Sequence, residues 1–223
     1  MITLNEVKQN EDAKEMIKAA NSALEVLGYT EHGLRHVGYV SKTASDILDA
    51  LGYDERTVEL TKITGYLHDI GNLVNRVNHG ITGATIVIPM LIKMGMPMNE
   101  IVRISTAIGN HEEQVGKPVS EIAAALIIAD KADAHRSRVH KKNFDPSDIH
   151  DRVNFSIKSN KLTVDKENKL ITYEITMDDT ASPMDFFSIY FSRMVFSQGA
   201  AEFLGCQYIL KINGMQMNLN NKQ

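Results

Sequence analysis

The sequence predicts a mainly α-helical protein that ends in a small α+β unit. Up to Lys142, apolar residues recur with the period of an amphipathic helix, whereas later segments alternate polar and apolar side chains. Between the two patterns, the segment from Asn143 to Asp148 is rich in turn-forming residues, which is typical of a linker or an exposed loop. We therefore expect a helical domain over residues 1–142 and a smaller unit over residues 143–223.

The first part divides into helices at residues that commonly begin or end one. Glycines are expected to end the first three helices, and capping side chains at Asp54, Asn99 and Ser120 are expected to begin three of the helices. Pro89 lies within the fourth helix and should kink or interrupt it. The predicted helices cover about residues 6–27, 37–51, 55–70, 81–94, 101–108 and 121–138.

The second part combines short strands with one long helix. Three alternating segments separated by turn-forming residues predict a small antiparallel meander. Ser182 and Pro183 are expected to start a helix that ends at about Leu204, before Gly205. The predicted strands cover residues 153–157, 161–164 and 170–177, with a last strand over residues 207–212.

The composition bounds the class of protein. Of the 223 residues 43% are hydrophobic, enough for a normal core, and a formal net charge of −4 argues against general nucleic-acid binding. The single cysteine, Cys206, excludes an internal disulfide and favours a cytoplasmic setting. The N-terminal segment lacks the apolar run of a signal peptide, and no apolar run approaches the ~20 residues of a membrane span. We expect no membrane association, and the sequence is compatible with a homodimer.

The pair His68-Asp69, at the end of an apolar helix, is the most informative feature of the chain. An imidazole and a carboxylate are costly to bury there without partners. Other histidines and one aspartate border the apolar faces of further helices or begin one, and could converge on the pair. These residues are His36, His79, His111 and Asp130. Four imidazoles and two carboxylates suit one or two divalent transition metals, which points to metal-assisted hydrolysis.

Each of these residues also has a simpler interpretation. A single inward histidine is more often a hydrogen-bonded core residue than a ligand, and Asp130 could pair with Arg136 or cap a neighbouring helix. Their recurrence on successive helices favours the metal site. The remaining histidines with polar or terminal surroundings, His32, His140 and His150, are interpreted as surface residues.

The chain resembles the HD-domain superfamily of metal-dependent phosphohydrolases over about residues 6–142. The matching motifs are GLRHVGYV with His36, YLHDIGN with His68 and Asp69, and IIADKADAHRSRV with Asp130. In addition, NHGITGA and GNHEE resemble the segments that carry two extra histidines in the dinuclear branch. The resemblance implies an HD-type helical core, with His36, His68, Asp69 and Asp130 on one metal, and His79 and His111 on a second metal bridged by Asp69.

The chain also departs from the family pattern. Many relatives have lysine where this chain has Asn72, so one phosphate contact is missing. The cyclic-dinucleotide phosphodiesterases read HHE where this chain has Asn110-His111-Glu112, and no GYP signature follows, which argues against cyclic-dinucleotide cleavage. The residues beyond Lys142 resemble no family that we can name.

These observations predict a phosphohydrolase that acts on a nucleotide or another small phosphate ester with metal-activated water. Asp69, Glu112 and Lys131 are the expected catalytic residues, and Asp130 is an alternative to Glu112 for orienting the water. Arg136 and Arg138 are expected to bind the substrate phosphate, the alternative being a solvated basic helix end. Imidazole and carboxylate ligands suit Fe, Mn, Ni, Co or Zn. Two other functions fit the same core: a ligand sensor or regulatory protein with a structural metal, and a metal-dependent oxygenase.

Overall fold

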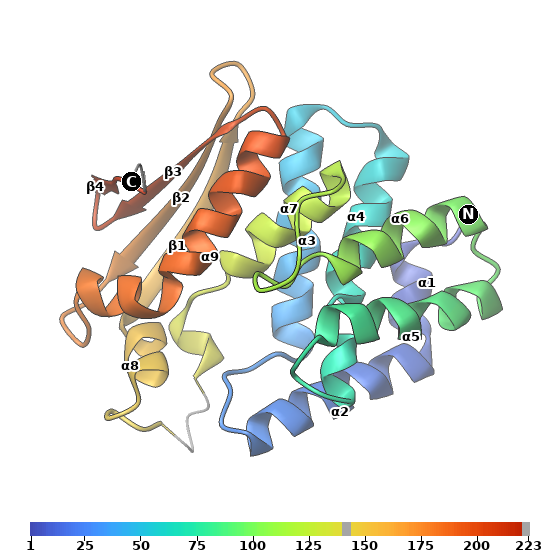
Figure 1. Cartoon of the computed structure of the whole chain (residues 1–223), viewed down its shortest axis with the longest axis horizontal. Helices are drawn as coiled ribbons and strands as arrows, with labels where there is room; N and C mark the ends of the chain where they lie inside the picture. The colour runs from blue at the N-terminus through green and yellow to red at the C-terminus, as the bar shows by residue number, and fades with distance from the viewer. Residues whose placement is uncertain (140–143, 220–223) are drawn as a thin grey trace.

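The computed structural model describes residues 1–139 and 144–219, and it places a group of helices beside a four-stranded sheet (Figure 1). The fold is mainly helical, as predicted. The helices of the first part are α1 Leu4–Gln9, α2 Glu11–Val26, α3 Leu34–Leu51, α4 Glu55–Leu67, α5 His79–Lys93, α6 Met98–Gly109 and α7 Glu121–Lys131, with 3-10 turns η1 Ile70–Leu73 and η2 Arg136–Arg138.

Local capping explains where several of these helices begin. The predicted caps Asp54 and Ser120 are confirmed, because their side chains accept hydrogen bonds from the backbone N–H of Thr57 and Ala123. The prediction for Asn99 is wrong, since α6 already begins at Met98. The single helix predicted over residues 6–27 is also wrong: the extended residue Asn10 separates α1 from α2 and caps α2.

Two further boundaries differ from the predictions. Pro89 does not interrupt α5, which continues to Lys93. The helix predicted to reach residue 138 ends at Lys131, because side chains bond to the backbone carbonyl of the next residue. That carbonyl, of Ala132, accepts hydrogen bonds from the side chains of Tyr39, Asn160 and Tyr173 instead.

The second part is a sheet with two helices, α8 Ile149–Ser156 and α9 Pro183–Phe203. The strands are β1 Ile157–Asp165, β2 Leu170–Met177, β3 Gln207–Ile212 and β4 Met215–Met217. The strand predicted over residues 153–157 is wrong, because Asp148 caps a helix there. The antiparallel pairing predicted between residues 161–164 and 170–177 is confirmed by β1 and β2. Because the chain returns through α9, β2 and β3 are parallel, whereas β1–β2 and β3–β4 are antiparallel.

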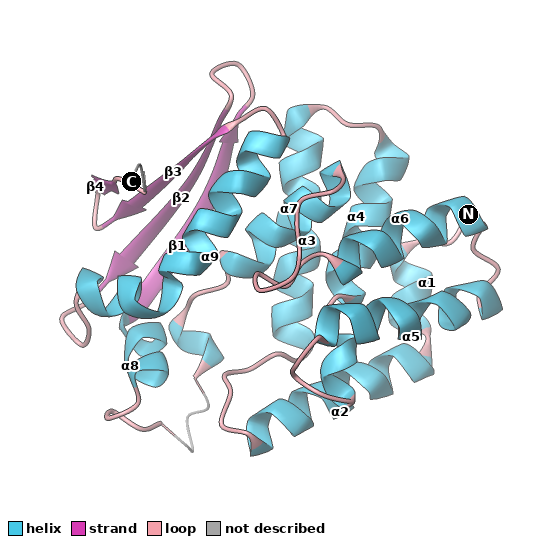
Figure 2. Ribbon diagram, viewed as in Figure 1, coloured by secondary structure: helices cyan, strands magenta, loops and turns pink. Residues whose placement is uncertain are grey.

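Helix α9 joins the two parts of the molecule. It lies between the sheet and the helical part (Figure 2) and contacts β3 on one side and α7 on the other. Leu126 of α7, Phe186 of α9 and Tyr173 of β2 belong to one continuous apolar core, so α9 packs on the helical part. The domain boundary expected between residues 142 and 143 lies outside the described residues and stays a prediction.

Among residues 1–139 and 144–219, no helix combines the length and the apolarity that crossing a membrane requires.

Candidate metal centre

Six side chains from five segments of the helical part converge on one buried position. His36 comes from the first turn of α3, His68 and Asp69 follow the last residue of α4, and His79 opens α5. His111 comes just after α6, and Asp130 lies near the end of α7. All four imidazoles and Asp69 are buried, and Asp130 is partly buried. These six residues, which the sequence predicts as metal ligands, are called the His/Asp cluster below.

Asp69 lies between two pairs of histidines. Its Oδ2 atom is 3.5 Å from His36 Nε2 and 3.6 Å from His68 Nε2. Its Oδ1 atom is 3.3 Å from His79 Nε2 and 3.9 Å from His111 Nε2. The two carboxylate oxygens of Asp69 therefore face different pairs, as a carboxylate that bridges two ions would.

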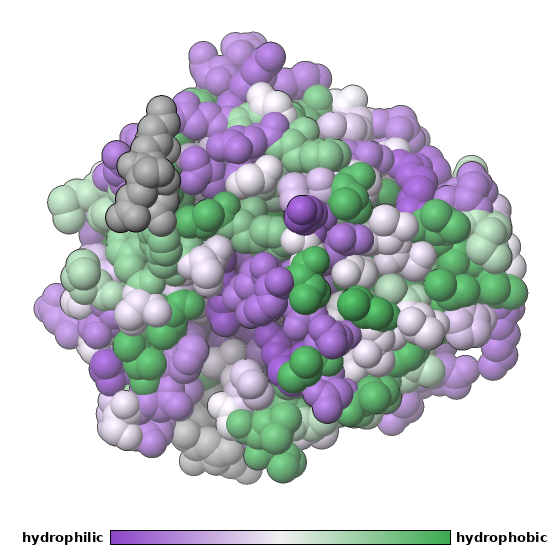
Figure 3. Space-filling model, in the orientation of Figure 1, coloured by the Kyte–Doolittle hydropathy of each residue, from purple (hydrophilic) through white to green (hydrophobic). Residues whose placement is uncertain are grey.

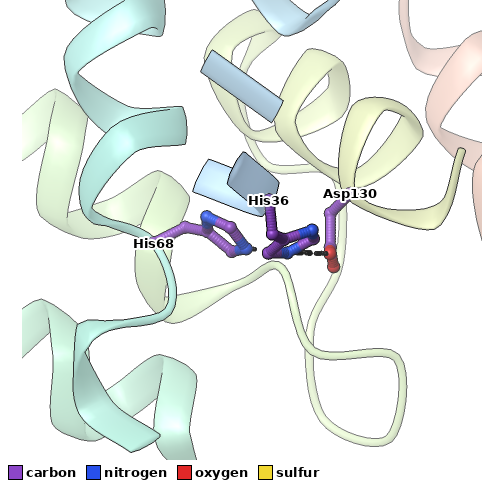
Figure 4. A group of neighbouring side chains, drawn as sticks. All are labelled: His36, His68 and Asp130. Carbon is purple, nitrogen blue, oxygen red and sulfur yellow. Dashed lines mark ion pairs between the residues drawn. The ribbon is translucent and has the colours of Figure 1, made fainter. Parts of the chain in front are cut away.

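Asp130 completes the first of these pairs. Its Oδ1 atom is 3.4 Å from His36 Nε2 and 3.6 Å from His68 Nε2 (Figure 4). His36, His68 and Asp130 form one group of side chains that could hold an ion, and His68, Asp69 and His111 form another.

The hydrogen bonds of the imidazoles fix which ring nitrogen faces the centre. Nδ1 of each ring lies against an oxygen atom that can only accept, so Nδ1 must carry the hydrogen. The acceptors are Asp133 Oδ2 at 2.7 Å for His36, Gly65 O at 2.9 Å for His68, Arg76 O at 3.1 Å for His79, and Ile108 O at 2.6 Å for His111. In the neutral ring, Nε2 then presents its lone pair to the cluster, which is the form that binds a metal.

Three buried polar atoms at this position have no hydrogen-bond partner: His36 Nε2, His68 Nε2 and Asp69 Oδ2. Buried polar atoms without partners are rare, because each one costs free energy. A divalent cation held between these atoms would satisfy all three at once. The donor set, neutral imidazole nitrogens with carboxylate oxygens, suits a divalent transition metal.

In the metal-free protein, the imidazoles and carboxylates of the cluster shift one another's pKa values. Burial would raise the pKa of Asp69, but the imidazoles around it, His68 foremost, hold that pKa well below its usual range. Burial and the cation of Arg138 would lower the pKa of His36, but the carboxylates of Asp130, Asp133 and Asp69 outweigh them and raise it to about 10. A protonated His36 thus supplies positive charge next to these carboxylates, as a bound metal ion would.

Asp133 supports the cluster from behind. It accepts hydrogen bonds from His36 Nδ1 and, through both oxygens, from the guanidinium of Arg35 at 3.1 and 2.7 Å. A carboxylate that holds the far nitrogen of a metal-binding histidine fixes its orientation and raises its basicity. Asp133 is not among the sequence-predicted site residues, although its spacing of three residues from Asp130 could have indicated it.

Two adjacent cavities open beside the cluster. The inner cavity has a volume of 30 Å³ and is lined by Arg76, Lys131, Arg138, Arg193, Asp69, Glu113, Asp130, His32 and His79. The outer cavity has a volume of 130 Å³ and shares His32, Arg76, Arg138 and Arg193 with the inner one. Figure 3 shows hydrophilic side chains gathered near the middle of the face that it presents.

The predicted catalytic residues beyond Asp69 lie in different surroundings. Lys131 lines the inner cavity, and its Nζ atom is 2.7 Å from Asp130 Oδ2 and 3.3 Å from Glu113. Glu112 lies 3.4 Å from Nδ1 of His79, on the side of that ring away from the cluster. Both catalytic roles stay predictions.

The predicted phosphate-binding arginines also differ. Arg138 lines both cavities, but its guanidinium donates to the backbone oxygens of Glu31 and Asp133. Arg136 lies outside both cavities and donates to Phe155 O and Asp178 Oδ2, each at 2.9 Å. The structure therefore brings Arg138, but not Arg136, to the cluster, and phosphate binding by either stays a prediction.

The three histidines interpreted as surface residues have different outcomes. His150 is exposed, as expected, and His140 lies outside the described residues. The interpretation is wrong for His32, which is buried, lines both cavities and accepts a hydrogen bond from Arg138 at 3.0 Å. Of the cavity-lining side chains, Arg76, Glu113 and Arg193 are not predicted from the sequence either, because nothing in their local sequence marks them.

Comparisons with known proteins give a family match and a similar solved structure. The family model of the HD domain matches residues 33–136. A solved structure of a predicted HD superfamily hydrolase from an uncultured Thermotogales bacterium is similar over 60% of this chain and 75% of its own, with 23% sequence identity and a TM-score of 0.46. No curated protein matches the sequence. The family match contains His36, His68, Asp69, His79, His111 and Asp130 in their expected order. The chain therefore carries an HD domain over residues 33–136.

Proposed function

We propose that this protein is a metal-dependent phosphohydrolase that acts on a nucleotide or another small phosphate ester. The HD domain and the His/Asp cluster indicate a metal-dependent hydrolase. The observation that supports the proposal most strongly is the convergence of the unpartnered atoms of His36, His68 and Asp69 beside a cavity lined by cationic side chains. Cationic side chains next to a metal site favour a phosphate ester over a neutral substrate.

The geometry of Asp69 supports a proposed ligand assignment. One ion would be held by His36, His68, Asp69 and Asp130, and a second by His79 and His111 with Asp69 as the bridge. The Nε2 atoms of His79 and His111 lie 3.0 Å apart, so both can turn toward one position. When bound, divalent ions would supply a Lewis acid for the phosphoryl oxygens and lower the pKa of water toward ~7.

The other residues of the site would position the reacting groups. Lys131, beside Asp130, can donate a hydrogen bond to a phosphoryl or leaving-group oxygen in the inner cavity. Asn72 donates to Asp69 Oδ1 at 2.9 Å and so keeps the bridging carboxylate oriented. Glu112, which faces Nδ1 of His79, would hold that imidazole in place, as a positioning residue.

Metal analysis together with phosphate-ester hydrolysis tests the proposal. Wild-type protein loaded separately with Mn, Fe, Co, Ni or Zn should bind up to two equivalents and hydrolyse p-nitrophenyl phosphate. Asp69→Asn and His68→Ala should lose metal and activity together. Asp46→Asn is the matched control, because Asp46 is exposed and pairs with Lys42 on its own helix.

The number of metals is tested separately. His111→Ala and His79→Ala should each remove about one metal equivalent, because the ligands of the other ion stay intact. Full metal content in Asp69→Asn would refute the site, and a metal-loaded wild type that hydrolyses no phosphate ester would favour a sensor with a structural metal. A homodimer, a cytoplasmic location and the absence of general nucleic-acid binding stay predictions.

A further inference from the structure

One wall of the two cavities comes from outside the HD domain. The family match ends at residue 136, but Arg193 of α9 lines both cavities. Tyr190 of α9 and Asn154 of α8 line the outer cavity as well. The chain beyond the HD domain therefore does more than pack against it, because it completes the surface next to the His/Asp cluster.

Arg193 is held in place by an aromatic ring. Its guanidinium lies 4.8 Å from the centre of the Tyr190 ring, and the Tyr190 hydroxyl donates to Asn154 at 2.9 Å. Among the described residues, Arg193 pairs with Glu113, whose Oε1 atom is 3.7 Å from Arg193 Nε, which is longer than a normal hydrogen bond. The ring thus orients the guanidinium, while its donors remain able to bind an anion.

Arg76 is a counterpart of Arg193 on the HD domain. Its guanidinium lies 5.5 Å from the centre of the Tyr29 ring and donates to Asn72 at 3.2 Å. Both arginines line both cavities, so each stands where the inner cavity meets the outer one. Their planar guanidinium groups suit bidentate hydrogen bonding to phosphate oxygens.

The charge of the inner cavity favours a doubly charged phosphate. Four cationic side chains and three carboxylates line it, and every divalent ion bound by the cluster adds two positive charges. A phosphate monoester carries up to two negative charges at neutral pH, whereas a diester carries one. Electrostatic complementarity therefore favours the monoester.

The outer cavity favours a small polar leaving group. Its volume of 130 Å³ is below the ~300–1,000 Å³ that is typical of pockets for drug-sized ligands. Thr30, Asp148, His150 and Asn154 give it hydrogen-bonding side chains, and Tyr29 and Tyr190 give it rings. Such a lining matches a hydroxyl-bearing group such as a sugar.

We propose that Arg76 and Arg193 bind the phosphoryl group of the substrate between them, and that the outer cavity accepts a small hydroxyl-bearing leaving group. The substrate is then the phosphomonoester of a sugar or another polyol, an assignment that rests on the proposed function. In the reaction, water forms a new P–O bond and the bond to the leaving alcohol breaks. One proton of the water ends on the alcohol oxygen, and orthophosphate is the second product.

Orthophosphate binding to the metal-loaded protein, measured by calorimetry, tests the arginines without relying on turnover. Arg193→Gln and Arg76→Gln should each weaken binding about tenfold, while the metal content stays that of the wild type. Arg193→Lys should recover part of the loss, because lysine keeps the positive charge but cannot form the bidentate hydrogen bonds of a planar guanidinium.

Arg152→Gln is the matched control. The Arg152 side chain is 29% exposed and lies 3.7 Å from Asp185, compared with 28% and 3.7 Å for Arg193 and Glu113, and it lines neither cavity. This variant should bind orthophosphate as the wild type does. Equal phosphate affinity in the wild type, Arg193→Gln and Arg76→Gln would overturn the assignment of the arginines, even if hydrolysis is normal.

Steady-state kinetics test the substrate class. Sugar monophosphates and glycerol phosphate should be hydrolysed with a higher kcat/KM than bis(p-nitrophenyl) phosphate, and Arg193→Gln should raise KM more than it lowers kcat. Preference for the diester would overturn the monoester assignment. If the wild type hydrolyses nothing but Arg193→Gln still weakens phosphate binding, the proposed function fails, the substrate assignment falls with it, and the anion site stands.

Discussion

The two sides of the cavities are built differently. On the HD-domain side, each imidazole of the His/Asp cluster is fixed by a hydrogen bond at Nδ1, and its other nitrogen faces a buried centre. On the side of α9, Arg193 is placed by the face of the Tyr190 ring and by a long contact with Glu113. The first arrangement suits metal binding, which needs exact ligand orientation, and the second suits substrate recognition, which tolerates adjustment.

The two sides are nevertheless connected through one backbone segment. The Ala132 carbonyl, just past the end of α7, accepts hydrogen bonds from Tyr39 of α3, Asn160 of β1 and Tyr173 of β2. The next residue is Asp133, which orients His36. The sheet therefore holds the segment that supports the metal cluster, although it contributes no residue to the cluster.

The largest effect expected from this comparison is that of Asp133→Asn on metal affinity. The substitution keeps the size of the side chain but weakens the hydrogen bond that orients His36, so we expect a 10- to 100-fold loss of metal affinity. Competition with a chromophoric chelator would measure it. Asp178→Asn is the control, because Asp178 also pairs with an arginine, Arg136, but lines neither of the cavities beside the cluster. Unchanged metal affinity in Asp133→Asn would show that His36 is oriented by its packing alone.

The sequence predicts the helical side of the site well, for a physical reason. Residues such as His68 and Asp130 lie on or next to apolar helical stripes, and a polar group on a buried face needs a partner. The structure confirms that these side chains meet. Helix α9 and strands β2 and β3 also appear within one or two residues of their predicted bounds, because turn-forming or capping residues mark their ends.

The sequence does not predict the other side of the site, because that side depends on long-range packing. Arg193 becomes a cavity residue only when α9 crosses from β2 to β3 and turns one face toward α7. The same crossover makes β2 and β3 parallel, which the alternating pattern of each strand does not indicate. Residues 153–157 alternate for only five positions, too few to distinguish a strand from the helix that Asp148 caps.

The pH dependence of metal binding tests whether His36 carries a proton in the metal-free cluster. With a pKa of about 10, His36 is protonated in the metal-free protein at neutral pH, but it must be neutral to bind an ion. Metal binding should therefore release the His36 proton, and apparent affinity should rise about tenfold per pH unit until about pH 10. Calorimetry in buffers of different ionisation enthalpy would count the proton. No proton release at pH 7.5 would contradict a protonated His36.

The raised pKa of His36 predicts opposite pH trends for the stability of the metal-free and the metal-loaded protein. The pKa of His36 in the folded, metal-free protein lies above its ordinary value of 6.5, so its contribution to stability is fully present below pH 6.5. That contribution is lost as the pH rises through about 10. Metal-free protein should thus unfold more easily between pH 7 and 10, whereas metal-loaded protein gains from tighter binding over the same range. Thermal unfolding with and without metal would reveal the two trends.

The smallest expected effect comes from a hydrogen bond between the sheet and the Ala132 carbonyl. It tests whether the sheet supports the metal cluster without setting its geometry. Tyr173→Phe removes the 2.8 Å hydrogen bond to the Ala132 carbonyl but leaves the donors from Tyr39 and Asn160 in place. We expect it to lower the free energy of unfolding by about 1 kcal/mol, measured by urea denaturation, and to leave metal content unchanged.

Tyr208→Phe is the appropriate comparison, because Tyr208 is also a buried tyrosine of the sheet. Its hydroxyl donates to the Met194 sulfur, at 3.7 Å, which is a weak acceptor, and also faces Ser197. Its loss should cost less than that of the Tyr173 hydroxyl. If Tyr173→Phe instead weakened metal binding as much as Asp133→Asn, the sheet would set the geometry of the cluster, and the separation between a metal-binding side and a recognition side would fail. If the two tyrosine variants were equally stable, the carbonyl of Ala132 would be adequately bonded by Tyr39 and Asn160 alone.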